Sequence, residues 1–301
     1  MSAISNSKYR LWFVSVRPWS FVMTAVSVAV GCVLAVTSAR RFSFGLAALT
    51  LLGALLVHAA TNLINDYFDT KNGVDKPGAP GTLYRPHPLV HKLFSASEVL
   101  AVTLVLYAVA AAIGGYLTMV RGWPVAAIAA AGALISLGYT AGPVEFKYHG
   151  LGEIVVFLVW GPLMTVGAYY TQVGSWLGAG TVVWASVPLG IWVALVLLAN
   201  NLKDLDYDSD TGIVTSATRL GREGAHQLFL GLVAMAYLVA VLGVLVGPFS
   251  AWMLLVLLSL PLAVQLAVKF WTLREIPPDA DPQTARVSTV FGLLLLAALI
   301  I

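Results

Sequence analysis

The sequence predicts an all-α polytopic membrane protein, with about nine transmembrane helices that form one bundle over residues 1–301. Three observations predict this class. Of the 301 residues, 59% are hydrophobic and only 10% are charged, whereas a soluble domain carries roughly 25% charged residues. The mean hydropathy is +0.87. Apolar stretches of about 20 residues, the length that spans a bilayer as a helix, follow one another along the chain.

Nine segments are long and apolar enough to be expected as membrane spans. They are residues 18–38, 44–65, 97–119, 123–141, 152–172, 181–202, 225–246, 249–271 and 286–301. The first follows basic residues, as a secretory signal does, but its apolar stretch exceeds the usual length of about 7–15 residues. We therefore expect it to remain as a mature helix. The ninth is short and ends with the chain.

The charged residues predict how these spans are oriented. With nine spans, the N-terminus and the loops after the second, fourth, sixth and eighth spans share one side. That side holds 14 of the 17 basic residues and all 14 acidic ones, and only Arg40, Arg41 and Arg121 lie opposite. The positive-inside rule then places the N-terminus in the cytoplasm and the C-terminus on the opposite side. Chemistry is expected at the cytoplasmic face, because the acidic residues gather there.

The same composition excludes two other classes. A net charge of +3 with scattered basic residues does not favour nucleic-acid binding. The abundant apolar residues exclude a disordered chain. The lone Cys32 cannot form an intrachain disulfide and does not indicate a compartment.

Two acidic clusters, which follow the second and sixth spans, match each other at an offset of 135 residues. The offset aligns Asn65, Asp69 and Gly73 with Asn200, Asp204 and Asp208. Residues four apart share one stripe of a helix, where stacked carboxylates repel each other. Oxygen ligands without Cys or His indicate a hard cation, and Mg²⁺ combines one or two carboxylates with waters and phosphates. The stripes therefore predict a metal-assisted diphosphate site.

Further motifs make the chain resemble the UbiA superfamily of intramembrane prenyltransferases, whose two Asp-rich motifs follow the second and sixth of nine helices. The motifs are Arg17-Pro18-Trp19-Ser20, Asn65-Asp66-x-x-Asp69, Tyr139-Thr140-Ala141-Gly142-Pro143, Lys147-Tyr148-His149-Gly150-Leu151-Gly152-Glu153, Gly161-Pro162-Leu163, Asn200-Asn201-x-x-Asp204-x-x-x-Asp208, Gly212-Ile213-Val214-Thr215 and Arg219-Leu220-Gly221. The segment from Tyr139 to Glu153 looks like the branch that prenylates dihydroxynaphthoate or related precursors of menaquinone.

The resemblance implies that residues 1–301 form one transmembrane prenyltransferase domain. Its activity would be Mg²⁺-dependent transfer of a polyprenyl group from a polyprenyl diphosphate to an aromatic acceptor similar to 1,4-dihydroxy-2-naphthoate. Two alternatives stay open. Another branch of the superfamily would use a 4-hydroxybenzoate, haem, chlorophyll or ether-lipid acceptor. A membrane transporter would instead place its acidic residues near the midplane of the bilayer, whereas here they crowd one interface.

The resemblance and the residue types together assign roles to the candidate site residues. The expected catalytic residues are Asp69, Asp204, Asp208, Tyr139 and Lys147. The expected metal ligands are Asn65, Asp66, Asp69, Asn200, Asp204 and Asp208. The expected diphosphate contacts are Arg85, Lys147, Lys203, Asn65 and Asn200. Tyr139 would stabilise an allylic cation through its ring or orient a substrate through its hydroxyl.

One position departs from the superfamily pattern. Many members have Asp where Gly73 stands, and Asp66 or Asp75 would then supply the missing ligand. The polar loops after the second and sixth spans are expected to cap the site as lids. His87 and His91, in the first of these loops, are either a base for the acceptor's ring proton or inert loop residues.

Overall fold

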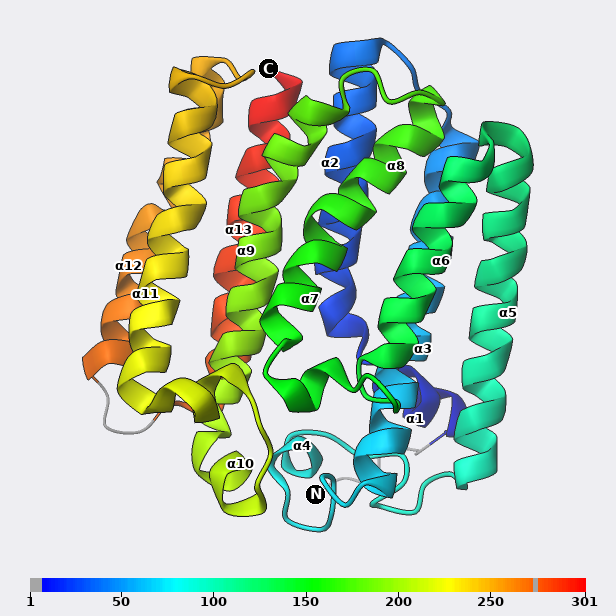
Figure 1. Cartoon of the computed structure of the whole chain (residues 1–301), viewed down its shortest axis with the longest axis vertical. Coiled ribbons are helices and arrows are strands. Elements are labelled where there is room, and N and C mark those ends of the chain that lie inside the picture. The colour runs from blue at the N-terminus through cyan, green and yellow to red at the C-terminus, as the bar shows by residue number, and fades with distance from the viewer. Residues whose placement is uncertain (1–6, 273–275) are drawn as a thin grey trace.

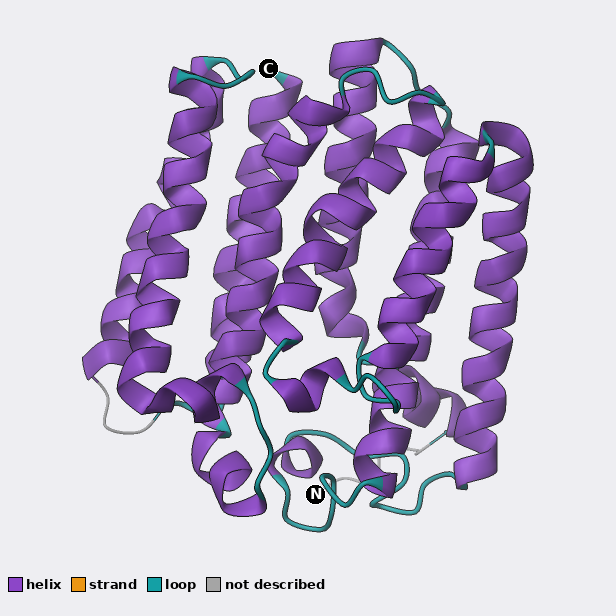
Figure 2. Cartoon of the chain, in the orientation of Figure 1, coloured by secondary structure: helices purple, strands orange, loops and turns teal. Residues whose placement is uncertain are grey.

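The computed structural model describes residues 7–272 and 276–301. Among these residues there is no strand, and helices joined by short loops make up the bundle (Figure 2). The long helices are α2 (Phe21–Ala39), α3 (Phe44–Lys71), α5 (Ala96–Arg121), α6 (Trp123–Gly138), α9 (Ala179–Lys203), α11 (Ser216–Leu245) and α13 (Ala280–Ile300). Helix α11 is kinked at Gly221, whose φ of +67° and ψ of 172° are not helical. The expected all-α polytopic class is confirmed.

Two further crossings are composite. Helix α7 (Gly152–Leu158) passes through a π-helical turn at Val159–Leu163 into α8 (Met164–Val173). A 3₁₀ helix at Ala251–Ser259 continues into α12 (Leu260–Thr272). The π turn contains Pro162, which lacks a backbone N–H and pushes the preceding residue out of the helical region. The neighbouring Trp160 carbonyl accepts a hydrogen bond from Ser27 Oγ at 2.6 Å, which ties the turn to α2.

Eight of the nine expected segments form helical stretches long and apolar enough to cross a membrane. The exception is α6, an apolar helix of 16 residues that ends at Gly138 rather than at residue 141. Other ends lie beyond the expected bounds, because a hydropathy pattern marks only the part of a helix embedded in lipid. Helix α3 continues six residues past 65, to Lys71, and α11 begins at Ser216 rather than 225. Thr215 starts α11 with a capping box.

The short elements gather at one end of the bundle, which we call the polar end. Helices α1 (Lys8–Ser15), α4 (Pro80–Leu83) and α10 (Leu205–Thr211) lie there, where α3 and α9 also finish, whereas the C-terminus lies at the other end (Figure 1). A 3₁₀ helix at Phe146–His149 lies between α6 and α7. The polar end therefore brings together both acidic clusters and the segment from Tyr139 to His149.

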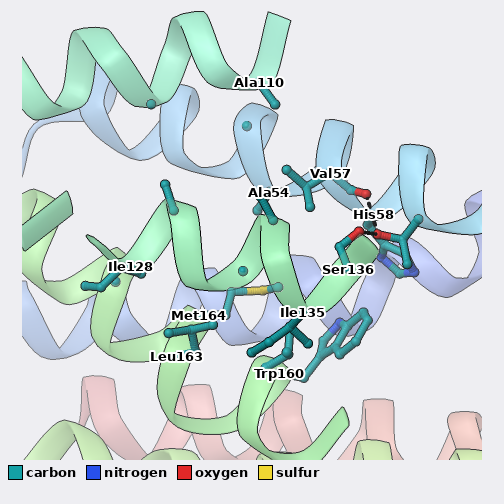
Figure 3. A pocket seen from close by; sticks show the side chains of 18 of the residues that line it. Ala54, Val57, His58, Ala110, Ile128, Ile135, Ser136, Trp160, Leu163 and Met164 are labelled. Atoms are coloured by element: carbon teal, nitrogen blue, oxygen red, sulfur yellow. Dashed lines mark hydrogen bonds between the residues drawn. The ribbon is translucent and has the colours of Figure 1, made fainter. Parts of the chain in front are cut away.

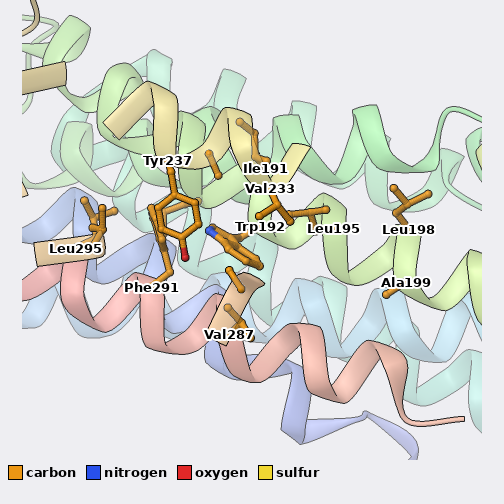
Figure 4. Packing of buried hydrophobic residues seen from close by; sticks show 14 of the residues in the cluster. Ile191, Trp192, Leu195, Leu198, Ala199, Val233, Tyr237, Val287, Phe291 and Leu295 are labelled. Carbon is orange, nitrogen blue, oxygen red and sulfur yellow. The ribbon is translucent and has the colours of Figure 1, made fainter. Parts of the chain in front are cut away.

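The largest apolar core surrounds α9, which packs against α7, α8, α11 and α13. The Trp192 ring of α9 is fully buried and lies 6.1 Å from the Tyr237 ring and 5.9 Å from the Phe291 ring, centroid to centroid (Figure 4). Close approach on the other face of α9 depends on glycine. A Cβ at Gly190 would lie 2.6 Å from the Phe157 carbonyl oxygen. Small residues at such crossings let helix backbones approach within a membrane.

Candidate active site

A cavity of about 360 Å³ lies among α2, α3, α5, α6 and the α7–α8 crossing. Its walls are mainly apolar, and many of the lining residues are glycine or alanine. On α3 the lining runs from Thr50 to Asn65, a distance of about 22 Å at 1.5 Å per residue. In Figure 3, His58, Ser136 and Trp160 lie toward one end, and Ile128 lies toward the other. The cavity is thus a long apolar space beneath the polar end.

The first acidic stripe lies on regular helix, one turn from residue to residue. Asn65 and Asp69 both belong to α3. Asn65 Oδ1 accepts a hydrogen bond from Thr140 Oγ1 at 2.8 Å. Asp69 is buried, with Oδ2 bound by Lys147 Nζ at 2.7 Å and Oδ1 accepting a short hydrogen bond from the Tyr148 hydroxyl. The segment that follows α6 therefore docks onto this stripe.

Gly73, the third position of the first stripe, lies beyond the end of helix α3. Helix α3 ends at Lys71, and Gly73 has a φ of +74° in the left-handed region, where L-residues are disfavoured. The backbone N–H groups of Val74 and Asp75 both donate to the Asp69 carbonyl, at 2.8 and 3.0 Å. Gly73 thus turns the chain back over the helix end, and the expected alignment with Asp208 on one helical stripe is wrong for this position.

The second stripe keeps its helical spacing across a break between two helices. Asn200 belongs to α9, Asp204 stands between α9 and α10, and Asp208 belongs to α10. The Asp204 N–H donates to the Asn200 carbonyl at 3.0 Å, and the Asp208 N–H donates to the Asp204 carbonyl at 2.9 Å. These bonds hold the three side chains about one turn apart.

In the second stripe Asp208 is buried, whereas Asn200 and Asp204 are half-buried. In the described ranges no Lys or Arg forms an ion pair with Asp204 or Asp208. Burial, and then the Asp204 charge, raise the pKa of Asp208 to about 7, while burial also raises the pKa of Asp204 to about 6. The charges of Lys147 and Asp69 act on Asp208 as well, so the two stripes lie within electrostatic range of each other. Such carboxylates require a cation to stay ionised when buried.

Lys147 stands between the stripes. Burial alone would lower its pKa, but the charges of Asp69, Tyr148 and Asp75 outweigh burial and raise it, so the ammonium stays charged. Tyr139 begins the same segment and lines the cavity, and burial raises the pKa of its hydroxyl. Gly152 leaves room for that ring, since a Cβ there would lie 3.2 Å from the Tyr139 hydroxyl oxygen.

Asp66 lies on a different side of α3 from Asp69. Its carboxylate is fully buried and bound by Arg17 Nη2 at 2.5 Å and by Arg85 Nη2 at 2.6 and 2.8 Å. The structure thus places Asp66 and Arg85, expected at the metal and the diphosphate, in a shared ion cluster. Arg85 is only 5% exposed. This cluster fixes the loop between α3 and α5 against the turn that joins α1 to α2, residues 16–20, which we call the N-terminal turn.

The two loop histidines are also tied into this loop. His87 is fully buried, and its ring Nε2 lies 3.0 Å from Asp75 Oδ2. The backbone N–H of His87 donates to His91 Nδ1 at 2.8 Å. Ligand atoms of Asp66, Asp75 and His87 lie within 4.8 Å of one another, close enough to hold a metal. Asp66 is already bound by two guanidinium groups. Both histidines therefore shape the loop.

Two contacts join the acidic region to the rest of the molecule. The Tyr207 hydroxyl of α10 donates to the Val74 carbonyl at 3.0 Å, linking the two polar loops. Lys203 Nζ donates to Asn200 Oδ1 at 3.0 Å and pairs with Asp281 at 2.8 Å. Lys203 therefore lies beside the second stripe, anchored to α13.

The site combines a long apolar cavity with two carboxylate-bearing stripes at the polar end of a bundle of membrane-spanning helices. The sequence model of the UbiA prenyltransferase family matches residues 22–296, and the chain belongs to this family of prenyltransferases. The expected family and enzyme class are confirmed.

Individual relatives cover nearly the whole chain. A UbiA prenyltransferase domain-containing protein 1 homolog of Drosophila melanogaster is 32% identical, over 97% of this chain and 79% of the relative. The 1,4-dihydroxy-2-naphthoate octaprenyltransferase of Bacillus subtilis is 31% identical, over 97% of this chain and 92% of the relative. The name of the Bacillus subtilis relative specifies an aromatic acceptor, whereas the name of the Drosophila relative specifies none.

Solved structures share the fold at low sequence identity. A UbiA homolog from Aeropyrum pernix matches with a TM-score of 0.71 and 18% identity, over 94% of this chain and 97% of that one. A homolog from Archaeoglobus fulgidus, solved with GPP and Mg²⁺, matches with a TM-score of 0.64 and 16% identity, over 96% and 99%. The helical bundle is therefore the family's fold.

Proposed function

We propose that this protein transfers a polyprenyl group from a polyprenyl diphosphate to an aromatic quinone precursor similar to 1,4-dihydroxy-2-naphthoate. The observation that supports it most is that the first carboxylate stripe begins at Asn65, which lines the long apolar cavity, while the second stripe lies within electrostatic range of the first. The stripes suit the diphosphate and the cavity suits the prenyl tail. The Bacillus subtilis relative, named for this acceptor, supports the naphthoate assignment. The solved homolog bound to GPP and Mg²⁺ supports a prenyl diphosphate as the donor.

The donor set fits Mg²⁺, because it consists of carboxylate and amide oxygens without sulfur. In this proposal the metal is held by Asn65, Asp69, Asn200, Asp204 and Asp208. When bound, Mg²⁺ neutralises the charge of the departing diphosphate. Asp66 is left out of the ligand set, since both arginines neutralise it already.

The protein's own groups would divide the remaining work. Lys147 contacts the diphosphate as a compact point charge, with Lys203 next to Asn200 as a second cation. The apolar walls keep water from the electron-poor allylic carbon. Tyr139 lies at the junction of cavity and stripes, where its ring can face that carbon. Arg85 fixes the loop between α3 and α5.

Activity with a panel of acceptors tests the proposal. Purified protein, a radiolabelled polyprenyl diphosphate and Mg²⁺ should convert 1,4-dihydroxy-2-naphthoate to a prenylated product, and EDTA should abolish the reaction. 4-Hydroxybenzoate serves as the comparison acceptor. Product with 4-hydroxybenzoate alone would reassign the acceptor, and no product from folded protein with any acceptor would overturn the proposed reaction.

A further inference from the structure

Helix α3 carries a second polar stripe beside the acidic one. His58, Asn62 and Asp66 are spaced four residues apart, so they form one stripe. Each makes its contacts with the N-terminal turn or α2. His58 Nδ1 lies 2.9 Å from Thr24 Oγ1, Asn62 Nδ2 donates to the Val16 carbonyl at 2.8 Å, and Asp66 binds Arg17. The stripe that contains Asn65 and Asp69 makes its contacts with the segment after α6 instead.

The hydrogen bonds along this second stripe leave His58 little capacity for a ligand. Ser20 Oγ donates its only proton to the Arg17 carbonyl at 2.8 Å, so it accepts from His58 Nε2, which lies 3.1 Å away. His58 Nδ1 then carries no proton and accepts from the Thr24 hydroxyl, whose oxygen accepts from Trp160 Nε1 at 3.1 Å. Every polar hydrogen in this chain of contacts has an acceptor. The chain holds the Trp160 ring and the Arg17 turn in place.

Arg17 differs from its neighbours in having unused donors. Among the described residues that line the cavity, Arg17 alone carries a formal charge. Its Nη2 binds one oxygen of Asp66, yet its Nε is buried without a hydrogen-bond partner. A quarter of the side-chain surface stays accessible. Asp66 takes only the Nη2 donor of Arg17, whereas Arg85 Nη2 contacts both Asp66 oxygens.

The backbone fixes where this guanidinium sits. Arg17 has a φ of +55° in the left-handed region, which costs energy for a residue with a side chain. Pro18 follows it, and the Ser20 N–H donates to the Arg17 carbonyl at 3.0 Å. A conformation of this kind persists only where surrounding contacts enforce it. Here this conformation holds the Arg17 guanidinium beside the cavity, on the side of the His58 stripe, whereas Lys147 binds the Asp69 stripe.

We propose that Arg17 binds the carboxylate of the aromatic acceptor. Resting on the prenyl transfer proposed above, this narrows the acceptor to an aryl carboxylic acid. A guanidinium with free N–H groups suits a planar carboxylate. Trp160 and Tyr139 line the same cavity and offer ring surfaces to an aromatic body. The acceptor then enters beside the His58 stripe, while the diphosphate occupies the Asp69 stripe.

Two acceptors that differ only in the carboxylate test this role. Initial rates would be measured with 1,4-dihydroxy-2-naphthoate and with 1,4-dihydroxynaphthalene, for the wild type and for Arg17→Gln. In the variant the KM for the carboxylate should rise about 10- to 100-fold, as expected for loss of charge-assisted hydrogen bonds. The KM for dihydroxynaphthalene and the KM for the polyprenyl diphosphate should stay within about twofold.

Two further variants separate recognition from structure. Arg17→Lys keeps a cation on Asp66 but loses the fork of donors, so it should still impair only the carboxylate acceptor. Arg85→Gln removes the other arginine of the same ion cluster, outside the cavity, and should change the two acceptors equally. Thermal unfolding of each purified variant shows that it is folded.

The outcomes are distinguishable. If Arg17→Gln raises the KM of the polyprenyl diphosphate, or impairs both acceptors equally, Arg17 does not recognise the acceptor, although the proposed transfer stands. The same holds if the wild type has equal KM values for the two acceptors. A wild type that prenylates neither acceptor overturns the proposed function, and this inference with it.

Discussion

At the scale of single residues, the site contains carboxylates in two different electrostatic states. Asp69 is buried but bound by Lys147 and Tyr148. Asp208 is also buried but forms no ion pair with Lys or Arg among the described residues, and its pKa is raised to about 7. The same change of Asp to Asn should therefore have opposite effects on the stability of the metal-free protein at these two positions.

Asp69→Asn should abolish transfer and destabilise the metal-free protein. The change leaves the Lys147 ammonium buried without its counter-ion, which costs about 1–3 kcal/mol or more. The melting temperature in EDTA should fall below that of the wild type, and the turnover rate should fall at least 100-fold, a loss of about 2.7 kcal/mol of transition-state stabilisation. Full activity in this variant would rule out the first stripe as part of the metal site.

Asp208→Asn should abolish transfer equally but leave the melting temperature in EDTA unchanged or raised. Here the substitution removes an unpaired buried charge rather than half of an ion pair. Mg²⁺ with a polyprenyl diphosphate should stabilise the wild type against heat, by mass action, and should no longer stabilise the variant. A lower melting temperature in EDTA would show that Asp208 is paired in the metal-free protein.

At the scale of helices, α3 positions both sides of the site and then ends. Its two stripes diverge because residues 58, 62 and 66 contact the N-terminal turn, whereas 65 and 69 contact the segment after α6. Gly73 lies past the helix end with a positive φ and open space around the Cβ position. An aspartate there would thus be strained and off the stripe.

Gly73→Asp should accordingly give no gain in turnover or in apparent Mg²⁺ affinity. We expect a loss of stability of about 1 kcal/mol, since non-glycine residues pay for the left-handed conformation. Activity measured against Mg²⁺ concentration, together with thermal unfolding, checks this. A clear fall in the Mg²⁺ concentration needed for half-maximal rate would show that the loop can bring a third ligand to the first stripe.

Glycines in the interior of the bundle permit the crossing of α9 and the α7–α8 break. Gly190→Ala should strongly destabilise the protein, because its Cβ would lie 2.6 Å from the Phe157 carbonyl oxygen and 3.0 Å from Gly161 Cα. Gly180→Ala is the matched control on the same helix, with nothing within 4 Å of the added Cβ. Thermal unfolding should separate the two variants, and similar melting temperatures would contradict the tight crossing.

Part of the site followed from local pattern and part did not. Spacing along the chain was enough to predict Asn65 with Asp69 and the stripe from Asn200 to Asp208. It could not predict that Asp66 pairs with Arg17 and Arg85, because side chains from residues 17 and 85 meet it only in the folded bundle. Tyr148 follows Lys147 in the sequence, yet the hydrogen bond from its hydroxyl to Asp69 depends on the 3₁₀ turn at Phe146–His149.

The fold was predictable because hydropathy is also a local pattern of the sequence. The prediction was wrong only in local details. Hydropathy marked every crossing, because each must be apolar to lie in lipid. It did not reveal the π turn at Val159–Leu163, or that α3 and α11 extend beyond their apolar parts. Polar residues that pack at the polar end continue those helices, and no hydropathy window detects them.

At the scale of the whole molecule, the polar end holds the proposed site, and the positive-inside rule predicts that it faces the cytoplasm. Single cysteines test this in a Cys32→Ser background. A Lys71→Cys label site, exposed at the polar end, should react with an impermeant maleimide only in inside-out vesicles. A Ser175→Cys site, exposed in the loop between α8 and α9, should react only in right-side-out vesicles. The reverse pattern would invert the proposed topology.

The short helix α6 creates a local hydrophobic mismatch between the protein and the bilayer. Its 16 residues cover about 24 Å at 1.5 Å per residue, against a hydrocarbon thickness of about 30 Å. Lipids beside this helix must compress or the helix must be shielded, at a fraction of a kcal/mol per Å of mismatch. Because α6 also forms one wall of the cavity, we expect lipid acyl-chain length to influence the space proposed for the prenyl tail.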